Sequence, residues 1–395
     1  MAHFENNPKP KQRLLYLVSE DWYFCSHRLK LAATAKEKGY EVAVATRVNA
    51  HSKVIQQHGL TLFPLKHFRR AGLNPWREIL TLIEIWRLYR QFKPDIVHHV
   101  AIKPVLYGSL VARLYKIPQV VNALAGMGYL FTSKKTIPRL ASTLLLKVFR
   151  KIFNQKHHTL IVQNQDDERL WRDYAKVKPT RIALIRGSGV DIKQFSPSPE
   201  PEGIPIVVCA SRMLKDKGIE DLAQAALILA RKRIRARILL CGPADDDNPG
   251  SLSATQLRQW EQNVSLEWLG PVADMSKRYA ECHIAVLPSY REGMPKSLLE
   301  AAAAGLPIIT TNVPGCREVV ENGRNGLLVP AQQPIALAEA LGILINHSKL
   351  RQKFGRASRK KAVNEFADSL IIEQTLNLYA EKHIATTQEA IVDAA

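Results

Sequence analysis

Residues 195–205 read FSPSPEPEGIP, and this short stretch divides the sequence into two parts with the same pattern. It holds four prolines in eleven residues. Because proline lacks a backbone N–H and has a fixed φ, the stretch cannot form a helix or a central strand. Apolar segments that alternate with helix-like segments stand on both sides of it. We therefore interpret residues 195–205 as a linker between two α/β domains.

The two sides of the linker begin in the same way. The first opens with RLLYLVS (13–19), the helix-like segment SHRLKLAATAKEKGY (26–40) and EVAVATR (41–47). The second opens with IPIVVCASR (204–212) and GIEDLAQAALILARK (218–232). Strand segments that are apolar almost throughout are typical of parallel sheets covered by helices on both faces. Ligands of such sheets bind beyond the carboxyl ends of the strands. The sequence therefore predicts two α/β domains whose parallel sheets face each other across a cleft.

The expected domain boundaries follow from these segments. Residues 1–12 look like a disordered leader, residues 13–195 like the first domain and residues 203–367 like the second. The helical segment at 368–390 follows the second domain, and we expect it to pack back on the first. A chain of 395 residues fits two domains better than one, because single cores rarely grow to that size.

The composition is that of a globular protein with a strong excess of positive charge. Hydrophobic residues make up 46% and charged residues 23% of the chain, and the formal net charge is +20. This charge predicts an anionic partner, although an inert basic surface is the alternative. The sequence shows no zinc-ligand spacing, aromatic RNA-binding motif or basic helix–turn–helix pattern, so we do not expect it to bind nucleic acid.

The cysteines and the apolar runs bear on the cellular compartment. The five cysteines form no CxxC pair and most lie in strand-like segments, which favours buried reduced thiols and a cytosolic compartment. The sequence has no signal-peptide pattern and no run of 18 apolar residues. We therefore expect a cytoplasmic protein without a transmembrane helix.

One long segment carries only positive charge. Residues 96–165 contain ten basic residues and no acidic residue. Within them, residues 134–158 form a basic amphipathic segment of the kind that lies on anionic membranes. The apolar residues expected to share one face of this helix are Leu144, Leu145, Val148, Phe149 and Ile152. We expect this region to dock the protein on a membrane; the alternative is that the apolar face packs on the domain core.

Two basic residues follow the first strand of the second domain. In VCASRMLKDKGI (208–219), Ser211, Arg212 and Lys217 stand between an apolar strand and a helix. Arginine binds phosphate bidentately, lysine adds a mobile point charge, and a helix N-terminus favours anions. The arrangement predicts a diphosphate site, with a solvated basic turn as the alternative.

Two glutamates stand eight positions apart in YREGMPKSLLEA (290–301). Glu292 lies in a glycine–proline loop after an apolar strand, and Glu300 lies on the apolar helix that follows. A carboxylate amid apolar residues needs hydrogen-bond donors, and the vicinal hydroxyl groups of sugars supply them in pairs. The spacing indicates a sugar-binding site, whereas the alternative is two surface acids at the start of a helix.

These segments resemble glycosyltransferase family 4. The likeness also covers CGPADDDNPG (241–250), EWLGPVADM (267–275) and residues 288–330, and it runs in order along the chain from residue 26 to the last helix. The resemblance implies the GT-B fold, in which two Rossmann-like domains with parallel sheets face each other. It also implies a hexosyltransferase that takes a sugar from a nucleotide donor, retains the anomeric configuration and needs no metal. An oxocarbenium-like transition state is expected, as in other glycosyl chemistry.

The resemblance also implies roles for individual residues. Arg212 and Lys217 would neutralise the donor diphosphate, Glu300 would accept hydrogen bonds from the ribose, and Glu292 would face the transferred sugar. The remaining positions that we assign to the donor site are Ser211, Gly242, Gly293, Met294 and Pro295. These roles amount to electrostatic stabilisation of the leaving group together with positioning of the sugar.

A bacterial subgroup that elongates lipid-linked oligosaccharides shares further segments. They are an SHR segment and stretches resembling NALAGMGYLFT (122–132) and the NP of DDDNP (245–249). This likeness implies a UDP-N-acetylhexosamine donor, an undecaprenyl-diphosphate-linked glycan acceptor and a peripheral position on the inner face of the plasma membrane. The chain departs from many family members in SEDWYFCSHR (19–28), which lacks a glycine-rich turn.

Three histidines and one asparagine are candidates for the acceptor side. His98 and His99 end the strand DIVHHV (95–100), so one of them should face the cleft, and His99 is our catalytic candidate. His27 could contact a phosphate or cap a helix, and a satisfied core histidine is the alternative for the other two. Loop residues expected near the acceptor are Asn122, Gly126 and Gly128.

Competing interpretations stay open on the sequence alone. A GT-B enzyme with a soluble acceptor, a sugar-nucleotide epimerase and a non-catalytic scaffold share the fold. The acid-free basic segment favours a membrane-bound acceptor over a soluble one. The combined presence of both cations and both glutamates argues against a scaffold without activity.

Overall fold

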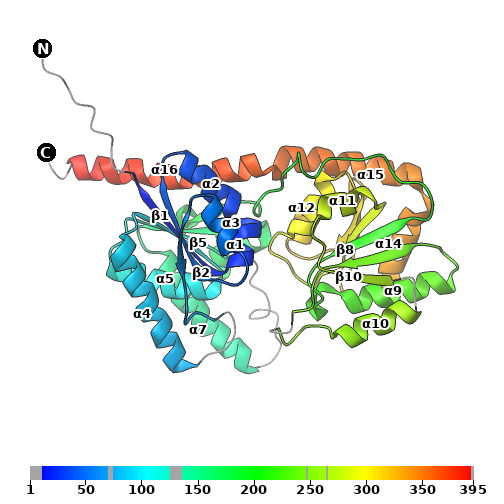
Figure 1. Ribbon diagram of the computed structural model, residues 1–395, viewed down its shortest axis with the longest axis horizontal. Helices are drawn as coiled ribbons and strands as arrows, with labels where there is room; N and C mark the ends of the chain where they lie inside the picture. The colour runs from blue at the N-terminus through cyan, green and yellow to red at the C-terminus, as the bar shows by residue number, and fades with distance from the viewer. Residues whose placement is uncertain (1–10, 70–73, 125–135, 246–247, 264–265, 393–395) are drawn as a thin grey trace, which may run out of the picture.

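The computed structural model describes residues 11–69, 74–124, 136–245, 248–263 and 266–392. Most of the expected leader, together with Gly126, Gly128, Lys134 and Lys135, lies outside these ranges. Figure 1 shows two α/β domains side by side along the long axis of the molecule, joined at the top by the last helices of the chain.

The first domain is built on a seven-stranded sheet in which every pairing is parallel. Its strand order is β3-β2-β1-β4-β5-β6-β7. Strands β2 and β3 therefore lie on one side of β1, and the strands from β4 on lie on the other side. The strands are β1 (Arg13–Glu20), β2 (Glu41–Arg47), β3 (Thr61–Pro64), β4 (Ile96–Val100), β5 (Gln119–Ala123), β6 (His158–Val162) and β7 (Ile182–Leu184).

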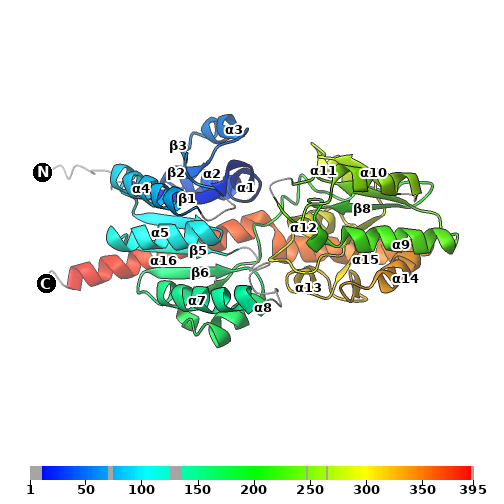
Figure 2. The same ribbon diagram turned by 90° about the horizontal axis from the view of Figure 1, so that it is seen from below.

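The helices of the first domain cover both faces of this sheet. Helices α4, α5 and α7 form one layer, which is in front in Figure 2, and α5 contacts both of its neighbours. The helical segments are α1 (Asp21–His27), α2 (Leu29–Glu37), α3 (Ser52–Gln57), α4 (Pro75–Phe92), α5 (Ile102–Leu114), α7 (Thr136–Phe153), α8 (Gln165–Arg169), the π-helix η1 (Leu170–Tyr174) and the 3₁₀ turn η2 (Pro179–Arg181).

The second domain has a six-stranded sheet, which is also parallel throughout. Its order is β10-β9-β8-β11-β12-β13, so β9 and β10 lie on one side of β8 and the later strands lie on the other side. The strands are β8 (Ile206–Ala210), β9 (Arg237–Cys241), β10 (Leu266–Gly270), β11 (Ile284–Leu287), β12 (Ile308–Thr311) and β13 (Gly326–Val329).

The helices of the second domain alternate with these strands. They are the 3₁₀ turn η3 (Lys215–Lys217), α9 (Ile219–Arg231), α10 (Ala254–Asn263), α11 (Met275–Ala280), α12 (Lys296–Ala303), α13 (Cys316–Val319), α14 (Pro334–Asn346), α15 (Ser348–Lys361) and the π-helix η4 (Ala362–Phe366). Together with the sheet they enclose one apolar core of the second domain.

The last helix, α16 (Asp368–Val392), leaves the second domain and lies on the first. Its Ile371, Ile372 and Tyr379 are buried in the same core cluster as β1 and α2. The Gln119 side-chain amide donates to the Leu378 carbonyl at 2.6 Å. The first domain is therefore completed by the end of the chain.

The central strands of the first domain are buried on both faces. All five residues of β4, β5 and β6 are buried, as expected for parallel strands between two layers of helices. The predicted fold class, two Rossmann-like domains with parallel sheets, is confirmed by this topology.

The first helix begins earlier than the sequence pattern predicts. We expected one helix over residues 26–40, whereas α1 already begins at Asp21 and the chain bends at Arg28 before α2. The buried Asp21 carboxylate accepts from the backbone N–H groups of Asn49 and His51, at 2.7 and 2.9 Å. Because these bonds tie the start of α1 to the loop after β2, the helix begins next to β1.

Candidate active site

The predicted donor-site residues lie where two adjacent strands of the second sheet end. Strands β8 and β11 pair directly, so the loops that follow them are neighbours. Arg212 and Lys217 follow β8, and Glu292 follows β11. The Tyr290 N–H donates to the Asp216 carbonyl at 2.8 Å and ties the two loops together. Both loops lie at the carboxyl ends of the strands, where ligands of parallel sheets bind.

Lys217 and Glu292 form an ion pair at the centre of this region. The Lys217 Nζ atom lies 2.5 Å from Glu292 Oε1, and the Ser289 hydroxyl donates to the same oxygen at 2.6 Å. Only 15% and 13% of the two charged side chains is exposed. Gly218 permits the close approach of the loop after β8 to the loop after β11. Its φ is +68°, and a Cβ there would lie 2.1 Å from the Pro288 carbonyl oxygen.

Arg212 forms a second ion pair, with a residue that the sequence pattern did not indicate. Its Nη1 atom lies 2.5 Å from Asp245 Oδ2, on the loop after β9. The Ser211 hydroxyl donates to the Arg212 carbonyl at 3.1 Å and shapes the turn. A Cβ on Gly242 would lie 1.9 Å from the Ser211 carbonyl oxygen, so only glycine fits between these two loops. Both candidate phosphate-binding cations are thus held by carboxylates in this structure.

Glu300 lies on the second turn of α12, on a helix whose neighbouring residues are buried. Its side chain is 14% exposed, and the Lys296 Nζ atom lies 3.7 Å from its Oε1. Burial raises the pKa of the Glu300 carboxyl, and the Lys296 ammonium opposes this shift. A buried carboxylate with one distant cation retains capacity to accept hydrogen bonds from a ligand.

Residues of the first domain bind the loop that carries Glu292. The Asn164 side-chain amide donates to the Gly293 carbonyl at 2.8 Å. The Arg291 guanidinium donates to Asp167 at 2.8 Å, and the Asp167 side chain is 2% exposed. The loop is therefore fixed between the two domains. Met294 is buried beside it, and a Cβ on Gly187 of the connecting segment would lie 2.8 Å from Met294 Cγ.

Helix α12 also reaches the first domain. Pro295 is its N-cap residue, and the Lys296 ammonium donates to the Ser26 carbonyl at 2.6 Å. Lys296 therefore links Glu300 to α1. The sequence offered no signal for the residues that make these contacts across domains, because their partners lie more than one hundred positions away: Asn164, Asp167, Arg291 and Lys296.

Helix α1 faces the second domain with two stacked rings. The rings of Tyr23 and His27 lie 4.1 Å apart and 5° from parallel. Burial, followed by the charges of Lys296 and Arg28, lowers the pKa of His27 to about 3. The positive charge of Arg212 also acts on Tyr23, whose pKa burial raises. The His27 imidazole is consequently neutral and lies next to the cations of the second domain.

His98 and His99 do not face the second domain, contrary to our expectation. His99 is fully buried; its Nε2 lies 2.7 Å from the Tyr89 hydroxyl and its Nδ1 2.9 Å from Asn122 Oδ1. His98 is buried on the other face of the sheet, with Nδ1 2.6 Å from the Tyr379 hydroxyl. Burial lowers the pKa of both imidazoles, that of His99 to about 4. His99 is therefore a core residue in this geometry.

Asn122 belongs to the same buried network. It is fully buried and also accepts a hydrogen bond from the Ser109 hydroxyl at 3.0 Å. Asn122 and His99 both lie inside central strands, where side chains point at the helix layers and not along the strand toward a ligand. The expectation of an acceptor loop at Asn122 fails for this reason.

The apolar face predicted for the membrane on α7 packs largely on the core. Phe149 is fully buried and Ile152 is 8% exposed, in a cluster with β6 and Trp171. Leu144 and Val148 remain exposed, at 65% and 36%. The strong amphipathicity of this segment thus reflects the contact of a helix with its own sheet.

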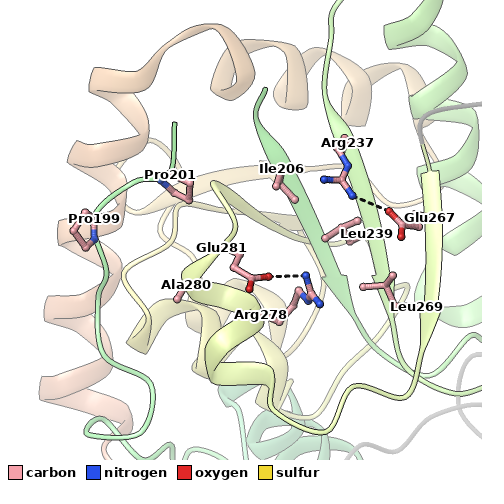
Figure 3. A pocket seen from close by; sticks show the side chains of 10 residues that line it. All are labelled: Pro199, Pro201, Ile206, Arg237, Leu239, Glu267, Leu269, Arg278, Ala280 and Glu281. Carbon is pink, nitrogen blue, oxygen red and sulfur yellow. Dashed lines mark hydrogen bonds and ion pairs between the residues drawn. The ribbon is translucent and has the colours of Figure 1, made fainter. Parts of the chain in front are cut away.

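A groove of about 610 Å³ lies elsewhere on the second domain (Figure 3). It is lined by apolar side chains and by two ion pairs, Arg237 with Glu267 and Arg278 with Glu281. Ile206 and Arg237 are the first residues of β8 and β9, so the groove lies near the amino ends of these strands. It is therefore separate from the donor-site residues.

The described residues also bear on metals and membrane spans. Within the described ranges, no group of three or more His, Cys, Asp or Glu side chains is placed to hold a metal ion. The same residues include no helix that is both long and apolar enough to span a bilayer.

Two family descriptions match the chain, one for each domain. Glycosyl transferases group 1 matches residues 190–361, and Glycosyl transferase 4-like matches residues 13–164. Together these matches span most of the sequence, and each falls on one of the two sheets.

Individual proteins are similar over most of their length. The N,N'-diacetylbacillosaminyl-diphospho-undecaprenol alpha-1,3-N-acetylgalactosaminyltransferase of Campylobacter jejuni is 26% identical over 89% of this chain and 94% of its own length. The UDP-Gal:alpha-D-GlcNAc-diphosphoundecaprenol alpha-1,3-galactosyltransferase of Escherichia coli is 25% identical, with 77% and 80% covered.

Solved structures share the fold at lower identity. The crystal structure of Anabaena Alr3699/HepE in complex with UDP and glucose has a TM-score of 0.76 and 17% identity, over 94% of this chain and all of the other. The two family matches, the paired parallel sheets and this fold likeness agree with one another. The chain is therefore a hexosyltransferase of the GT-B fold, with a first domain of the glycosyl transferase 4-like kind and a second domain of the glycosyl transferases group 1 kind.

Proposed function

We propose that this protein transfers a sugar from a UDP-sugar to a glycan carried on undecaprenyl diphosphate, with retention of the anomeric configuration. The observation that carries the proposal is the placement of Arg212, Lys217 and Glu292 in neighbouring loops after β8 and β11. The largely buried Glu300 lies on the helix that follows the second of these loops, which is bonded to the first domain. The donor is a UDP-N-acetylhexosamine and the acceptor lies at the cytoplasmic face of the membrane.

The diphosphate of the donor replaces carboxylates on the two cations. In this structure Arg212 is bound to Asp245 and Lys217 to Glu292, so carboxylates hold both cations in place. A diphosphate offers several charged oxygens to both cations at once, and arginine can bind two of them. The same two charges stabilise the diphosphate as it leaves the sugar.

Release from Lys217 gives Glu292 its second role. Once Lys217 binds phosphate, the Glu292 carboxylate accepts hydrogen bonds from the hydroxyl groups of the transferred sugar. Ser289 holds the carboxylate in place through its hydrogen bond at 2.6 Å. The Gly293 carbonyl accepts a hydrogen bond from the Asn164 side-chain amide, and this bond fixes the position of the loop that carries Glu292.

Glu300 binds the ribose of the nucleotide. Its carboxylate is buried, and the nearest cation in the structure is 3.7 Å away. Two ribose hydroxyl groups would supply the hydrogen bonds that a buried carboxylate requires. Lys296 compensates the negative charge of Glu300 and holds α12 against α1 through the Ser26 carbonyl.

The reaction exchanges one bond at the anomeric carbon for another. The bond from that carbon to the diphosphate oxygen breaks, and a bond to the acceptor oxygen forms on the same face. The acceptor hydroxyl proton passes to the departing phosphate oxygen. No metal takes part in this proposal, because Arg212 and Lys217 supply the positive charge at the leaving group.

The acceptor assignment rests on the named activities of the Campylobacter jejuni and Escherichia coli relatives, both of which act on diphosphoundecaprenol-linked sugars. The donor assignment rests on the UDP-Gal named for the latter and on the UDP held by the Anabaena structure. The strong positive charge of the chain, +20, fits an anionic nucleotide and an anionic lipid diphosphate.

A thermal-shift screen of nucleotide sugars followed by a transfer assay tests the proposal. A donor at 100 times its dissociation constant stabilises the protein by about 2.7 kcal/mol. We expect a shift with UDP-N-acetylhexosamines that is lost in Lys217→Ala, and transfer to a diphosphoundecaprenol-linked sugar. A shift only with non-uridine nucleotides, or a product of inverted configuration, would contradict the proposal.

A further inference from the structure

Helix α4 carries an apolar stripe on its solvent side. Its exposed residues recur at helical spacing and include two tryptophans. They are Trp76 (78% exposed), Ile79 (48%), Leu80 (44%), Ile83 (39%) and Trp86 (39%). Because positions three and four apart share one side of a helix, these five side chains form one continuous stripe.

The stripe is not needed to attach α4 to the domain. A second set of side chains on the opposite side of the helix is buried against the sheet: Thr81, Ile85, Leu88, Tyr89 and Phe92. A helix at the surface of a soluble domain normally shows water a polar face. An outer apolar stripe opposite a complete inner one therefore indicates a partner outside this chain.

The stripe continues onto the neighbouring helices. Helices α4, α5 and α7 lie next to each other in one layer (Figure 2). On α5, Leu110 and Leu114 are 52% and 69% exposed, and on α7, Leu144 and Val148 are 65% and 36% exposed. One layer of the first domain thus presents apolar side chains from all three helices.

The charges on this layer are almost all positive. Exposed basic residues on or next to the three helices are Arg77, Arg87, Arg90, Arg113, Lys116, Lys147, Arg150 and Lys151. The three helices contain two acids, Glu78 and Glu84. Lys103 and Tyr107 bind Glu78 at 2.7 and 2.8 Å, and Glu84 accepts from the N–H groups of Lys66 and His67. Both acids are thus engaged by neighbouring groups.

We propose that the α4 stripe, residues Trp76, Ile79, Leu80, Ile83 and Trp86, inserts into the headgroup region of an anionic lipid bilayer. The inference rests on the proposed lipid-linked acceptor and moves the membrane contact from α7 to α4. Tryptophan favours the membrane–water interface, and the Arg90 guanidinium lies 5.7 Å from the Trp86 ring, so charge and aromatic surface occur together. Basic residues next to the bilayer add electrostatic attraction to its anionic headgroups.

A second copy of the chain is a poorer occupant for this face. Two copies with a net charge of +20 each would bring Arg87, Arg90 and Arg113 against the same residues of the other copy. Like charges placed opposite one another at an interface oppose association. Anionic lipid supplies the complementary charge that a second copy lacks.

Vesicle sedimentation with matched double variants tests the docking surface. Ile79→Glu/Ile83→Glu adds two acids to the stripe, and Ile335→Glu/Ile343→Glu adds two at positions 60% and 45% exposed on α14 of the second domain. On vesicles of phosphatidylcholine with phosphatidylglycerol we expect the first pair to lower partitioning at least about tenfold and the second to leave it unchanged. Equal binding of both variants, or no binding of the parent protein, would overturn the proposal.

Three further measurements make the result specific. Trp76→Phe/Trp86→Phe should remove the quenching of tryptophan fluorescence by brominated lipid, and undiminished quenching would contradict insertion of the stripe. A thermal unfolding curve shared by the parent and the α4 variant shows that folding is intact. Sedimentation equilibrium that finds a dimer broken by Ile79→Glu/Ile83→Glu, with vesicle binding unchanged, would assign the stripe to self-association and overturn the proposal.

The transfer assay separates this inference from the proposed function. The α4 variant should transfer normally to a water-soluble acceptor with a short prenyl chain, and slowly to the same glycan in vesicles. Vesicle binding through α4 without transfer to any lipid-linked acceptor would leave the docking surface standing and remove the proposed function. Transfer by the α4 variant at the parent rate on vesicles would remove the docking surface alone.

Discussion

Both domains place polar residues at the carboxyl ends of apolar parallel strands, yet the two sets end up in different environments. In the second domain Arg212, Lys217 and Glu292 converge and hold partly exposed charges beside the first domain. In the first domain His98 and His99 are buried in internal hydrogen-bond networks. The same sequence feature thus produced a candidate site in one domain and a polar core in the other.

The difference lies in how far each residue stands from the last paired position of its strand. Strand β8 ends at Ala210 and β11 at Leu287, so the second-domain residues lie in loops beyond the ladder. His98 and His99 pair within β4 with β1 on one side and β5 on the other. A residue inside a central strand points at a helix layer, whereas a residue beyond it is free to face a ligand.

The largest expected effect is the loss of transfer in Lys217→Ala. Removing the cation that we propose binds the leaving diphosphate should lower kcat/KM by about 100- to 1,000-fold. Lys215→Ala, an exposed lysine on the same short turn, is the matched control and should keep its activity. If Lys215→Ala and Lys217→Ala lower kcat/KM to the same extent with the same donor, Lys217 has no special role in the site.

The next effect concerns Glu300 and its pH dependence. Burial raises the pKa of this carboxyl, so it gains a proton at a higher pH than an ordinary glutamate as the solution is acidified. Protonation removes a hydrogen-bond acceptor for the ribose hydroxyl groups, so kcat/KM should fall as the pH is lowered. Glu300→Gln should lower donor affinity about tenfold and flatten this acid limb. An unchanged pH profile in Glu300→Gln would show that another group titrates there.

A smaller effect on activity, but a larger one on stability, is expected for Arg291→Ala. The substitution leaves the buried Asp167 without its cation and should lower the free energy of unfolding by about 3 kcal/mol. Arg317→Ala removes the more exposed pair with Asp166 and should cost less than about 1 kcal/mol. If the two variants unfold at the same urea concentration, the more buried ion pair does not contribute more to stability than the exposed one.

His99→Leu should lower the stability of the protein and leave its activity nearly unchanged, whereas Lys217→Ala should lower the activity. The substitution leaves the Tyr89 hydroxyl and Asn122 without one partner each, which should lower the free energy of unfolding by about 2 kcal/mol. The kcat value should change by less than about twofold. Thermal unfolding and steady-state kinetics on one preparation decide the matter, since a large loss of kcat at unchanged stability would return His99 to the site.

The smallest effect is expected from metal removal. If Arg212 and Lys217 supply the charge at the diphosphate, as we propose, initial rates should be the same with a divalent cation and with a chelator. A rate that depends on added magnesium would show that Arg212 and Lys217 do not supply enough charge at the leaving group. A parallel Lys217→Ala reaction tests whether magnesium then replaces the lost cation.

Much of the fold follows from the sequence because it depends on local patterns. Apolar runs of five residues, such as Leu14–Val18 in β1 and Ile206–Ala210 in β8, together with the prolines at 197–205, predict two parallel sheets, and the observed topology confirms this class. The start of α1 could not be predicted, since it depends on hydrogen bonds from Asp21 to a loop some thirty residues away. Element type is local, whereas element ends often depend on tertiary contacts.

The site could be predicted from the sequence only in part. The glycine–proline loop and the strand ends are sufficient to indicate Arg212, Lys217, Glu292 and Glu300. Asp245 and Arg291 were missed, because their roles depend on partners 33 and 124 positions away. The basic helix α7 was misleading for a related reason: amphipathicity shows that a face is apolar but not whether the sheet or the membrane covers it.

The two chain segments that cross between the domains are bonded to each other, and this determines how the domains can move. Val190 and Ala367 form a β-bridge, with Val190 N–H donating to Phe366 at 2.9 Å and Asp368 N–H donating to Val190 at 3.0 Å. Lys30 binds both Asp191 and Asp368, at 2.8 and 2.5 Å. Two segments joined by hydrogen bonds bend together more readily than they twist about each other. We therefore expect any opening and closing of the domains to bend both segments together at this point, so that rotation about one axis is favoured over twisting.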